Sequence, residues 1–400
     1  MRAISRPVSR IAGSVRAPGD KSCSHRAIMM AAVATGESTV TGLLEGEDVL
    51  NTAKAVKALG AGVERTGPGA WTITGVGARG FASPQGDLDF GNSGTGARLM
   101  MGLVGGHEVS ARFVGDASLS ARPMERVLKP LREMGVLAET APGGKLPAMI
   151  RGGNLKAIRY APPEASAQVK SAIMLAGLRA EGVTIVEERE ATRDHTERML
   201  RAFGVEVGVE ERAHGGPIVS VRGGQMLKAL KAEVAGDPSS AAFALAMALI
   251  AGEGGASVTG MLDNRTRTGF IDAAKAMGAD LRTEEDGQAT GEDTVRVIAS
   301  PSNLRGVSLD PALVPSMIDE LPIFAVLAAF AEGKTKVTGA AELRVKESDR
   351  IKAICAMLAV NGVEVEELPD GFIVTGRGSR GVAGGGTDRK STRLNSSHED

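Results

Sequence analysis

The sequence predicts an α/β protein with two domains, and three observations support this fold class. The chain has 400 residues, which is long for a single ordinary hydrophobic core. One pattern, in which an amphipathic helix ends at a glycine and a strand follows, occurs five times. Between the copies lie segments rich in Val, Ile and Thr with turn residues at their edges, which is typical of strands.

The repeated pattern predicts a structural unit that recurs along the whole chain. Its glycines lie 69 to 84 residues apart, at Gly60, Gly135, Gly204, Gly278 and Gly362. Glycine at this place is the usual left-handed cap that ends a helix. The expected strands are WTITGV, ARFVGD, TVRVIAS and FIVTG. A sixth copy at the same spacing would fall beyond the end of the chain.

Composition excludes several classes of protein. Hydrophobic residues make up 42% of the chain and charged residues 24%, as in globular domains. The net charge of −1 and the absence of a long basic run argue against a nucleic-acid partner. No apolar stretch is long enough to cross a membrane. Cys23 and Cys355 give neither a disulfide framework nor a metal-ligand pattern, so we expect a cytoplasmic protein without a bound metal.

Both ends of the chain allow two interpretations. The first residues, MRAISRPVSRIAGSV, fit a strand from Val8 to Val15 or an Arg- and Ser-rich transit peptide. The last residues, DRKSTRLNSSHED, are polar and without periodicity, so they are either a natural disordered tail or foreign sequence joined to a truncated gene. We expect residues 388–400 to be foreign and exclude them from the fold.

The segment PGDKSCSHR predicts an anion-binding helix start. Its PGD turn leads into an apolar helix, with Lys21 and Ser22 at the turn and His25 and Arg26 one turn further on. Free N–H groups and the helix dipole attract anions at such a position. The alternative is an ordinary capped helix whose charges are solvated.

Three further segments carry candidate anion-binding groups. The loop GNSGTGAR around Gly94 opens a helix, but it lacks the Lys-Ser/Thr ending of a P-loop and could be only a turn. Arg122 precedes Pro123, which is expected to begin a helix, and offers a planar fork for carboxylate or phosphate. Ser166 and Gln168 precede another apolar helix, where serine is also a common structural cap.

The last third of the chain supplies acids and further cations. Asp319 adjoins a Pro-bounded apolar stretch in PSMIDELPI. In LRVKESDR, the spacing of Lys346, Glu347 and Arg350 predicts that Lys346 and Arg350 share one face of a helix. A solvated, charged helix start is the alternative interpretation.

Taken in order, seven segments resemble the signature segments of the EPSP synthases, from about residue 7 to 387. They are PGDKSCSHR, GNSGTGARL, GDASLSARPM, SAQVKSA, GDPSSAAF, PSMIDELPI and LRVKESDR. LLEGEDV and TRDHTERML further resemble the class II branch of that family. The resemblance implies a two-domain inside-out α/β barrel, the enolpyruvyl transferase fold, built from βαβαββ units of which the sixth is missing here.

The resemblance also implies how the domains divide. Residues 1–18 would form the first strand of the C-terminal domain, and residues 19–236 the N-terminal domain with three units. Residues 237–387 would form the rest of the C-terminal domain.

The reaction that the resemblance implies moves the enolpyruvyl group of phosphoenolpyruvate to the 5-hydroxyl of shikimate 3-phosphate, with release of phosphate. It proceeds through a tetrahedral intermediate and requires no cofactor or metal. The implied partners are these two small molecules, and the implied protein is a monomer of the shikimate pathway.

Site residues follow from the resemblance, position by position. Those implied for shikimate 3-phosphate are Lys21, Ser22, Arg26, Ser166, Gln168, Arg193, Asp319 and Lys346. Those implied for phosphoenolpyruvate are Lys21, Gly94, Arg122, Gln168 and Arg350. In catalysis, Asp319 would take the proton of the 5-hydroxyl and Glu347 would protonate the methylene carbon, with Lys21 beside them.

The chain departs from the family pattern in one respect. A further Arg in a DHR-containing helix start and a late Lys, both of which contact phosphoenolpyruvate in the family, have no match here. A chain that binds a substrate without turning it over is therefore an alternative. A UDP-N-acetylglucosamine enolpyruvyl transferase is another, although its usual Cys before the ARP motif is absent from GDASLSARP.

The family inhibitor glyphosate competes with phosphoenolpyruvate. Naturally tolerant class II relatives carry Ala where this chain has Gly94, so the resemblance predicts a more sensitive enzyme here.

Overall fold

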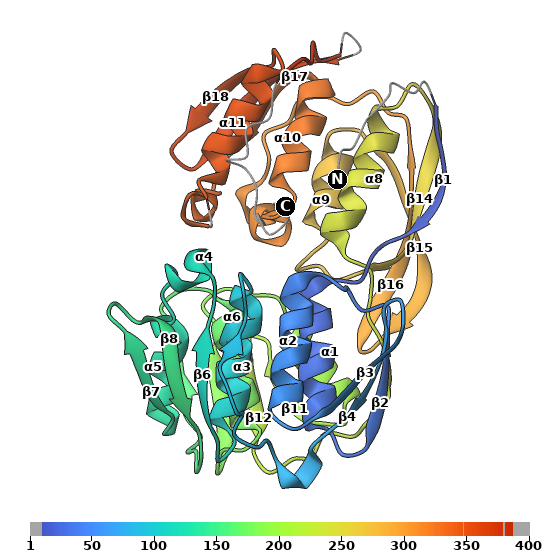
Figure 1. Ribbon diagram of the computed structural model, residues 1–400. Coiled ribbons are helices and arrows are strands. Elements are labelled where there is room, and N and C mark those ends of the chain that lie inside the picture. Colours follow the sequence, from blue (N-terminus) through green and yellow to red (C-terminus); the bar gives the residue numbers. More distant parts are fainter. Residues whose placement is uncertain (1–9, 347, 379–380, 387–400) are drawn as a thin grey trace. The chain divides into compact units, whose positions relative to one another are not determined.

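The chain folds into two compact units. The structure is a computed structural model, and it describes residues 10–346, 348–378 and 381–386 (Figure 1). The N-unit comprises Gly19–Ala235 and Gln288–Glu292. The C-unit comprises Met1–Pro18, Gly236–Gly287 and Asp293–Asp400.

The N-unit repeats one order of elements three times, namely a buried helix, a strand, a second helix and a two-stranded hairpin. The first repeat contains α1 (Lys21–Val33), β2 (Glu37–Thr41), α2 (Glu47–Ala58), β3 (Gly62–Gly67) and β4 (Ala70–Thr74). The second contains α3 (Gly94–Gly105), β6 (Ser110–Val114), α5 (Glu125–Met134), β7 (Leu137–Ala141) and β8 (Lys145–Arg151). The third contains α6 (Ala167–Gly177), β10 (Val183–Glu187), α7 (His195–Ala202), β11 (Val207–Glu210) and β12 (Ile218–Arg222).

Each repeat of the N-unit forms its own four-stranded sheet. The strand orders are β13-β2-β4-β3, β5-β6-β8-β7 and β11-β12-β10-β9. In every sheet the first strand of the repeat pairs antiparallel with the last strand of its hairpin. On its other edge it pairs parallel with a short strand, which is β13 (Lys231–Glu233), β5 (Leu88–Asp89) or β9 (Arg159–Tyr160). The short helix η1 (Gly77–Arg79) lies between the first and second repeats, and the short helix α4 (Ala117–Ser120) lies between β6 and α5 of the second.

Among its described residues, the C-unit contains two repeats of the same order. One contains α8 (Pro238–Ile250), β14 (Glu253–Leu262), α9 (Gly269–Ala276), β15 (Asp280–Ala289) and β16 (Glu292–Ser300), with β1 (Arg10–Arg16) parallel to β14. The other contains α10 (Leu321–Phe330), β17 (Glu332–Val337), α11 (Arg350–Val360), β18 (Glu364–Leu368) and β19 (Gly371–Arg377). The short helices η2 (Pro311–Met317) and η3 (Ala341–Val345) precede α10 and α11, and the sheet orders are β1-β14-β16-β15 and β17-β19-β18.

The five predicted cap glycines end their helices as expected. Gly60, Gly135, Gly204, Gly278 and Gly362 all have positive φ, between 77° and 114°. L residues with a side chain rarely adopt this conformation, so glycine at these places releases the chain from helix to strand. The predicted α/β class and the five repeats are confirmed, and each expected strand lies within or overlaps a strand of the structure.

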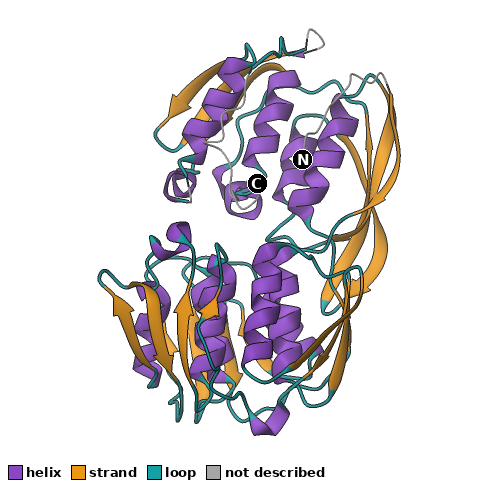
Figure 2. Cartoon of the chain, viewed as in Figure 1, coloured by secondary structure: helices purple, strands orange, loops and turns teal. Residues whose placement is uncertain are grey.

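The core of the N-unit lies between α1, α3 and α6, with the sheets around these helices (Figure 2). These helices are built from Ala, Met, Leu and Gly and are buried on nearly all sides. Close packing explains one glycine of α3, because a Cβ on Gly102 would lie 2.2 Å from the carbonyl oxygen of Ala172 in α6. The helix starts of α1, α3 and α6 are therefore held rigidly by the packing behind them.

In the C-unit, α8 packs against β14 and α10 but leaves part of its surface apolar and exposed. Phe243 and Met247 are 57% and 51% exposed, and their spacing places both on one face of α8. Within the described ranges, every helix is too short or too polar to cross a bilayer. The predicted foreign segment, residues 388–400, lies outside the described residues.

Candidate active site

The helices α1, α3 and α6 of the N-unit each begin at a side-chain cap, and these starts carry the predicted site residues. Asp20 accepts a hydrogen bond from the Cys23 amide at 2.8 Å, and Ser93 accepts one from the Gly96 amide at 3.1 Å. Ser166 accepts a longer one from the amide of Val169, at 3.4 Å. Since a cap satisfies only some of the amides in a first turn, the others remain for an anion.

Arg26 joins three elements of the N-unit. Its guanidinium donates from Nε to Thr196 Oγ1 at 2.7 Å, from Nη2 to Ser171 Oγ at 2.8 Å and from Nη1 to the Ser22 carbonyl at 3.1 Å. Burial lowers its pKa, although a guanidinium keeps its charge in proteins. These three bonds use three of its five N–H groups. The positive charge of Arg193, next to the start of α7, also acts on the Arg26 pKa, which places these two cations near each other.

A buried ion-pair triad lies behind Arg26. Lys170 Nζ is 2.9 Å from Glu188 Oε2 and 2.7 Å from Glu197 Oε1, and the three side chains are at most 3% exposed. Burial alone would lower the Lys170 pKa, but the charges of Glu197 and Glu188 outweigh it and raise this pKa. Two carboxylates share one ammonium, and burial raises the pKa of Glu188. The triad fixes α6 to α7, the helices that carry Ser171 and Thr196.

Gln168, at the start of α6, is bound to α3. Its Nε2 donates to Thr95 Oγ1 at 3.0 Å, and its Oε1 accepts from Arg98 Nη1 at 3.0 Å. Arg98 was not recognised in the sequence. It is buried on α3, and burial, followed by the charges of Arg126 and Arg122, lowers its pKa to about 10. The available signal was a charged residue inside an otherwise apolar helix, GTGARLMMGL.

Arg122 lies close to the loop around Gly94. Arg122 Nη2 donates to Asn92 Oδ1 at 2.7 Å and to Ser118 Oγ at 3.1 Å. A Cβ on Gly94 would lie 2.9 Å from Arg98 Nη1 and 3.3 Å from Arg122 Nη1. Gly94 therefore permits two guanidinium groups to approach the start of α3, which creates a local positive charge at this helix N-terminus.

Lys21 is the first residue of α1 and remains accessible. Its side chain is about half exposed, and Nζ lies 3.3 Å from Asp48 Oδ2. An exposed pair of this kind is weak, so the ammonium can exchange this partner for a ligand.

In the C-unit, the structure brings Asp319 and Arg350 together. Arg350 Nη1 donates to Asp319 Oδ1 at 3.1 Å, and Arg350 is the first residue of α11. Lys346 pairs with Glu342 instead. Glu347, the predicted proton donor, lies outside the described residues.

Three local predictions from the sequence are wrong. Lys346 and Arg350 do not share a helical face, because Asp349 caps α11 and the helix starts only at Arg350, while Lys346 is extended after η3. Pro123 does not begin a helix, since α5 starts at Glu125 and Arg122 lies in the turn before it.

The third concerns His25, which was expected to contribute to the anion-binding helix start with Lys21, Ser22 and Arg26. It is completely buried, its Nδ1 is 2.8 Å from Thr52 Oγ1, and its Nε2 is 3.4 Å from Ser93 Oγ. Burial, then the charges of Lys21 and Arg26, lower its pKa to about 3, so the ring is neutral at physiological pH. His25 links α1 to α2 and to the cap of α3.

His25 should make the stability of the protein depend on pH. The unfolded chain takes up a proton on this histidine below about pH 6.5, whereas the folded chain resists it down to about pH 3. In that window the free energy of unfolding should fall with decreasing pH by about 1.4 kcal/mol per unit from this group alone. His25→Asn, which cannot titrate, should flatten the dependence measured by urea unfolding, and His214→Asn, at an exposed position, should leave it unchanged. Equal slopes for wild type and His25→Asn would contradict the assignment.

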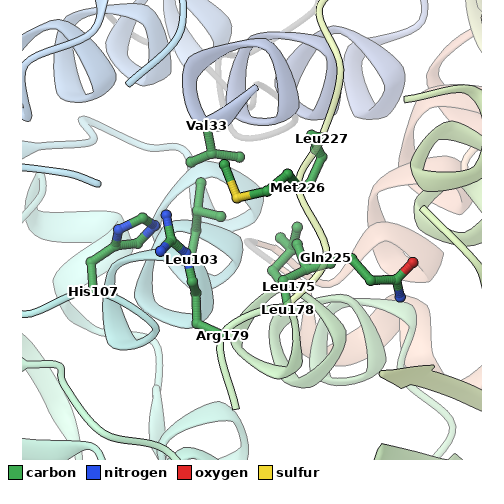
Figure 3. A pocket seen from close by; sticks show the side chains of 9 residues that line it. All are labelled: Val33, Leu103, His107, Leu175, Leu178, Arg179, Gln225, Met226 and Leu227. Atoms are coloured by element: carbon green, nitrogen blue, oxygen red, sulfur yellow. The ribbon is translucent and has the colours of Figure 1, made fainter. Parts of the chain in front are cut away.

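A small cavity lies at the opposite ends of the same helices (Figure 3). It has a volume of about 20 Å³ and is lined mainly by Val33 of α1, Leu103 of α3, Leu175 of α6 and the nearby His107 and Arg179. A volume of this size suits a single water molecule. None of the predicted site residues lines this cavity.

Repeated α/β units whose helix starts carry arginine, lysine and serine side chains are typical of proteins suited to binding small anions. Residues 5–393 match the family model described as EPSP synthase (3-phosphoshikimate 1-carboxyvinyltransferase). The chain belongs to the EPSP synthase family, and the resemblance inferred from its seven segments is confirmed.

Relatives in this family are similar over nearly the whole chain. A 3-phosphoshikimate 1-carboxyvinyltransferase of Hyphomonas neptunium is 58% identical over 383 residues, which are 96% of this chain and 87% of the relative. That of Phenylobacterium zucineum is 54% identical over 381 residues, 95% of this chain and 83% of the relative. The solved structure of EPSP synthase from Acinetobacter baumannii has a TM-score of 0.84 and 46% identity, and covers 92% of this chain and 82% of that one.

These matches bear on two of the alternatives left open by the sequence. They favour EPSP synthase over the UDP-N-acetylglucosamine enolpyruvyl transferase considered from the sequence. The family match also continues to residue 393, past residue 388, and so does not support a foreign segment starting there.

Proposed function

We propose that this chain transfers the enolpyruvyl group of phosphoenolpyruvate to the 5-hydroxyl of shikimate 3-phosphate and releases phosphate. Membership of the EPSP synthase family, with relatives of that activity at 50–58% identity, supports the reaction. The observation that carries it in the structure is the cluster of buried and half-buried cations at the helix starts of the N-unit. Arg26, Arg98 and Arg122 are held there by hydrogen bonds before any anion binds.

Both substrates are anions, and the family resemblance assigns a set of mostly cationic and polar residues to each of them. Lys21, Ser22, Arg26 and Arg193 would hold shikimate 3-phosphate, with Ser166, Gln168 and, in the C-unit, Lys346. Gly94, Arg122, Gln168 and, in the C-unit, Arg350 would hold phosphoenolpyruvate together with Lys21. Charge-assisted hydrogen bonds from preorganised donors are strong and need little rearrangement when charge develops in the transition state.

Two carboxylates would carry out the proton transfers. Asp319 would accept the proton of the 5-hydroxyl as that oxygen attacks the enolpyruvyl carbon, and Glu347 would donate a proton to the methylene carbon. Arg350 donates a hydrogen bond to Asp319, which favours the ionised carboxylate that a general base requires.

A thermal-shift titration tests the substrate class. Shikimate 3-phosphate at 100 times its dissociation constant should stabilise the protein by about 2.7 kcal/mol. Phosphoenolpyruvate should stabilise it as well, and UDP-N-acetylglucosamine should leave the melting temperature unchanged. Stabilisation by shikimate 3-phosphate without any phosphate release would favour the non-catalytic binder, and no response to either substrate would overturn the proposal.

Gly94→Ala should affect glyphosate inhibition more than substrate use. The added methyl would force Arg98 Nη1 to move and would press on Arg122, so the Michaelis constant for phosphoenolpyruvate should rise. The inhibition constant of glyphosate should rise further, because the longer ligand also reaches the methyl. Gly86→Ala, where a Cβ meets nothing within 4 Å, is the matched control. Equal shifts of the two constants would show that Gly94 does not discriminate between the ligands.

We also propose that the protein is a cytoplasmic monomer whose partners are these two small molecules. Both cysteines, Cys23 and Cys355, are free thiols, as is usual in a reducing compartment. Light scattering of the purified protein tests the monomer directly.

A further inference from the structure

Three buried side chains of the N-unit place a metal-binding set of atoms close together. A carboxylate oxygen of Asp20, the thiol sulfur of Cys23 and a ring nitrogen of His195 all lie within 4.8 Å of one another. The residues are 1%, 2% and 0% exposed. Sulfur, imidazole nitrogen and carboxylate oxygen are the donors that Zn²⁺ takes in proteins. Because His195 belongs to α7 and the other two lie at the start of α1, the sequence spacing gave no sign of this group.

The contacts of His195 indicate which of its two ring nitrogens is available beside Asp20 and Cys23. Its Nδ1 is 2.7 Å from Glu292 Oε1, and its Nε2 is buried without a hydrogen-bond partner. Since Glu292 engages Nδ1, the atom that His195 can offer is Nε2. A buried ring nitrogen without a partner is costly, and few occur in folded proteins. A carboxylate on the far nitrogen is the usual support of a metal-bound histidine.

A neighbouring group of similar composition serves a different role. Asp194, His195 and Glu292 also have ligand atoms within 4.8 Å of one another. Arg198 Nε, however, lies 2.7 Å from Asp194 Oδ2 and 3.5 Å from Glu292 Oε2. This guanidinium already supplies the positive charge, so these carboxylates support His195 rather than bind a metal.

We propose that Asp20, Cys23 and His195 form a site for one soft divalent cation such as Zn²⁺. Cys23 lies in the first turn of α1, where the helix dipole favours the thiolate that binds metals. Three protein ligands leave a fourth tetrahedral position for a water molecule. A bound metal would fix the first turn of α1, which carries Lys21 and Ser22, to the start of α7. The site is independent of the proposed reaction.

Metal binding to the reduced, EDTA-treated protein tests the proposal. Calorimetry with Zn²⁺ should show one equivalent bound and a raised melting temperature. Co²⁺ should produce a thiolate-to-metal charge-transfer absorption. Cys23→Ser should abolish this absorption and weaken Zn²⁺ binding at least about tenfold. Cys355→Ser changes the other cysteine, which lies in α11 of the C-unit, and should behave as wild type.

A second variant keeps the test decisive if Cys23→Ser folds poorly. His195→Gln retains the thiol but lacks Nε2, and it should lose the charge-transfer absorption as well. The proposal is overturned if the wild type binds no stoichiometric Zn²⁺, or if both variants fold and bind it with wild-type affinity. It is also overturned if Cys355→Ser is the variant that loses the absorption.

Discussion

Replacing Lys170 with methionine should lower the free energy of unfolding by about 3–5 kcal/mol, the largest stability effect expected for this chain. The change leaves the carboxylates of Glu188 and Glu197 buried without the ammonium that now lies within 2.9 Å of both. Methionine has a similar length, so the loss comes from the uncompensated charge rather than from a cavity. Urea unfolding followed by circular dichroism measures it.

The control is a lysine on the surface of the same unit. Lys129→Met, at an exposed position of α5, should change the free energy of unfolding by less than about 0.5 kcal/mol. Adding Glu188→Gln and Glu197→Gln to Lys170→Met should recover part of the loss, because no buried charge then remains unpaired. An unfolding midpoint for Lys170→Met equal to that of wild type would show that the triad does not hold α6 and α7 together.

Asp319→Asn should reduce turnover by about 10²–10⁴-fold while the binding of both substrates survives. Asparagine keeps the size of the side chain and can accept the hydrogen bond from Arg350, but it cannot take a proton at neutral pH. Steady-state kinetics should therefore show a lower kcat with little change in KM.

Asp310→Asn is the matched control for this change. Asp310 caps η2, in the segment that leads to Asp319, and asparagine serves equally well as a cap. Its kinetics should match wild type. If Asp319→Asn retained wild-type turnover, the proton of the 5-hydroxyl would have to go to another group.

The repeated architecture could be predicted because it depends on local signals. A helix that ends at Gly60 or Gly204 needs a residue that tolerates positive φ, and glycine identifies that place in the sequence. The apolar helices α1, α3 and α6 could be predicted equally well from the sequence, since each follows a cap residue and contains few charges.

The site was predictable only in part, because several of its contacts join residues far apart in the chain. Arg26 was found from its motif, but its partners Ser171 and Thr196 come from α6 and α7. Arg98 had a local signal, a charge inside an apolar helix, but its partner Gln168 comes from the distant start of α6. His25 was placed among the anion-binding groups because its burial between α1, α2 and α3 has no local signature.

The wrong prediction that Lys346 and Arg350 share a helical face has a different cause. The spacing of Lys346 and Arg350 fits a helix, but Asp349 is a stronger local signal, because its side chain accepts from the Lys352 amide and begins α11 after Lys346. Here a cap residue outweighed side-chain periodicity.

The most direct test of the proposed function is the release of phosphate when the purified protein is mixed with both substrates, with the product identified by mass spectrometry. One phosphate should be released per phosphoenolpyruvate consumed, only when shikimate 3-phosphate is present, and the product should carry the added enolpyruvyl group. Phosphate release that does not require shikimate 3-phosphate, or no release although both substrates bind, would contradict the proposed function.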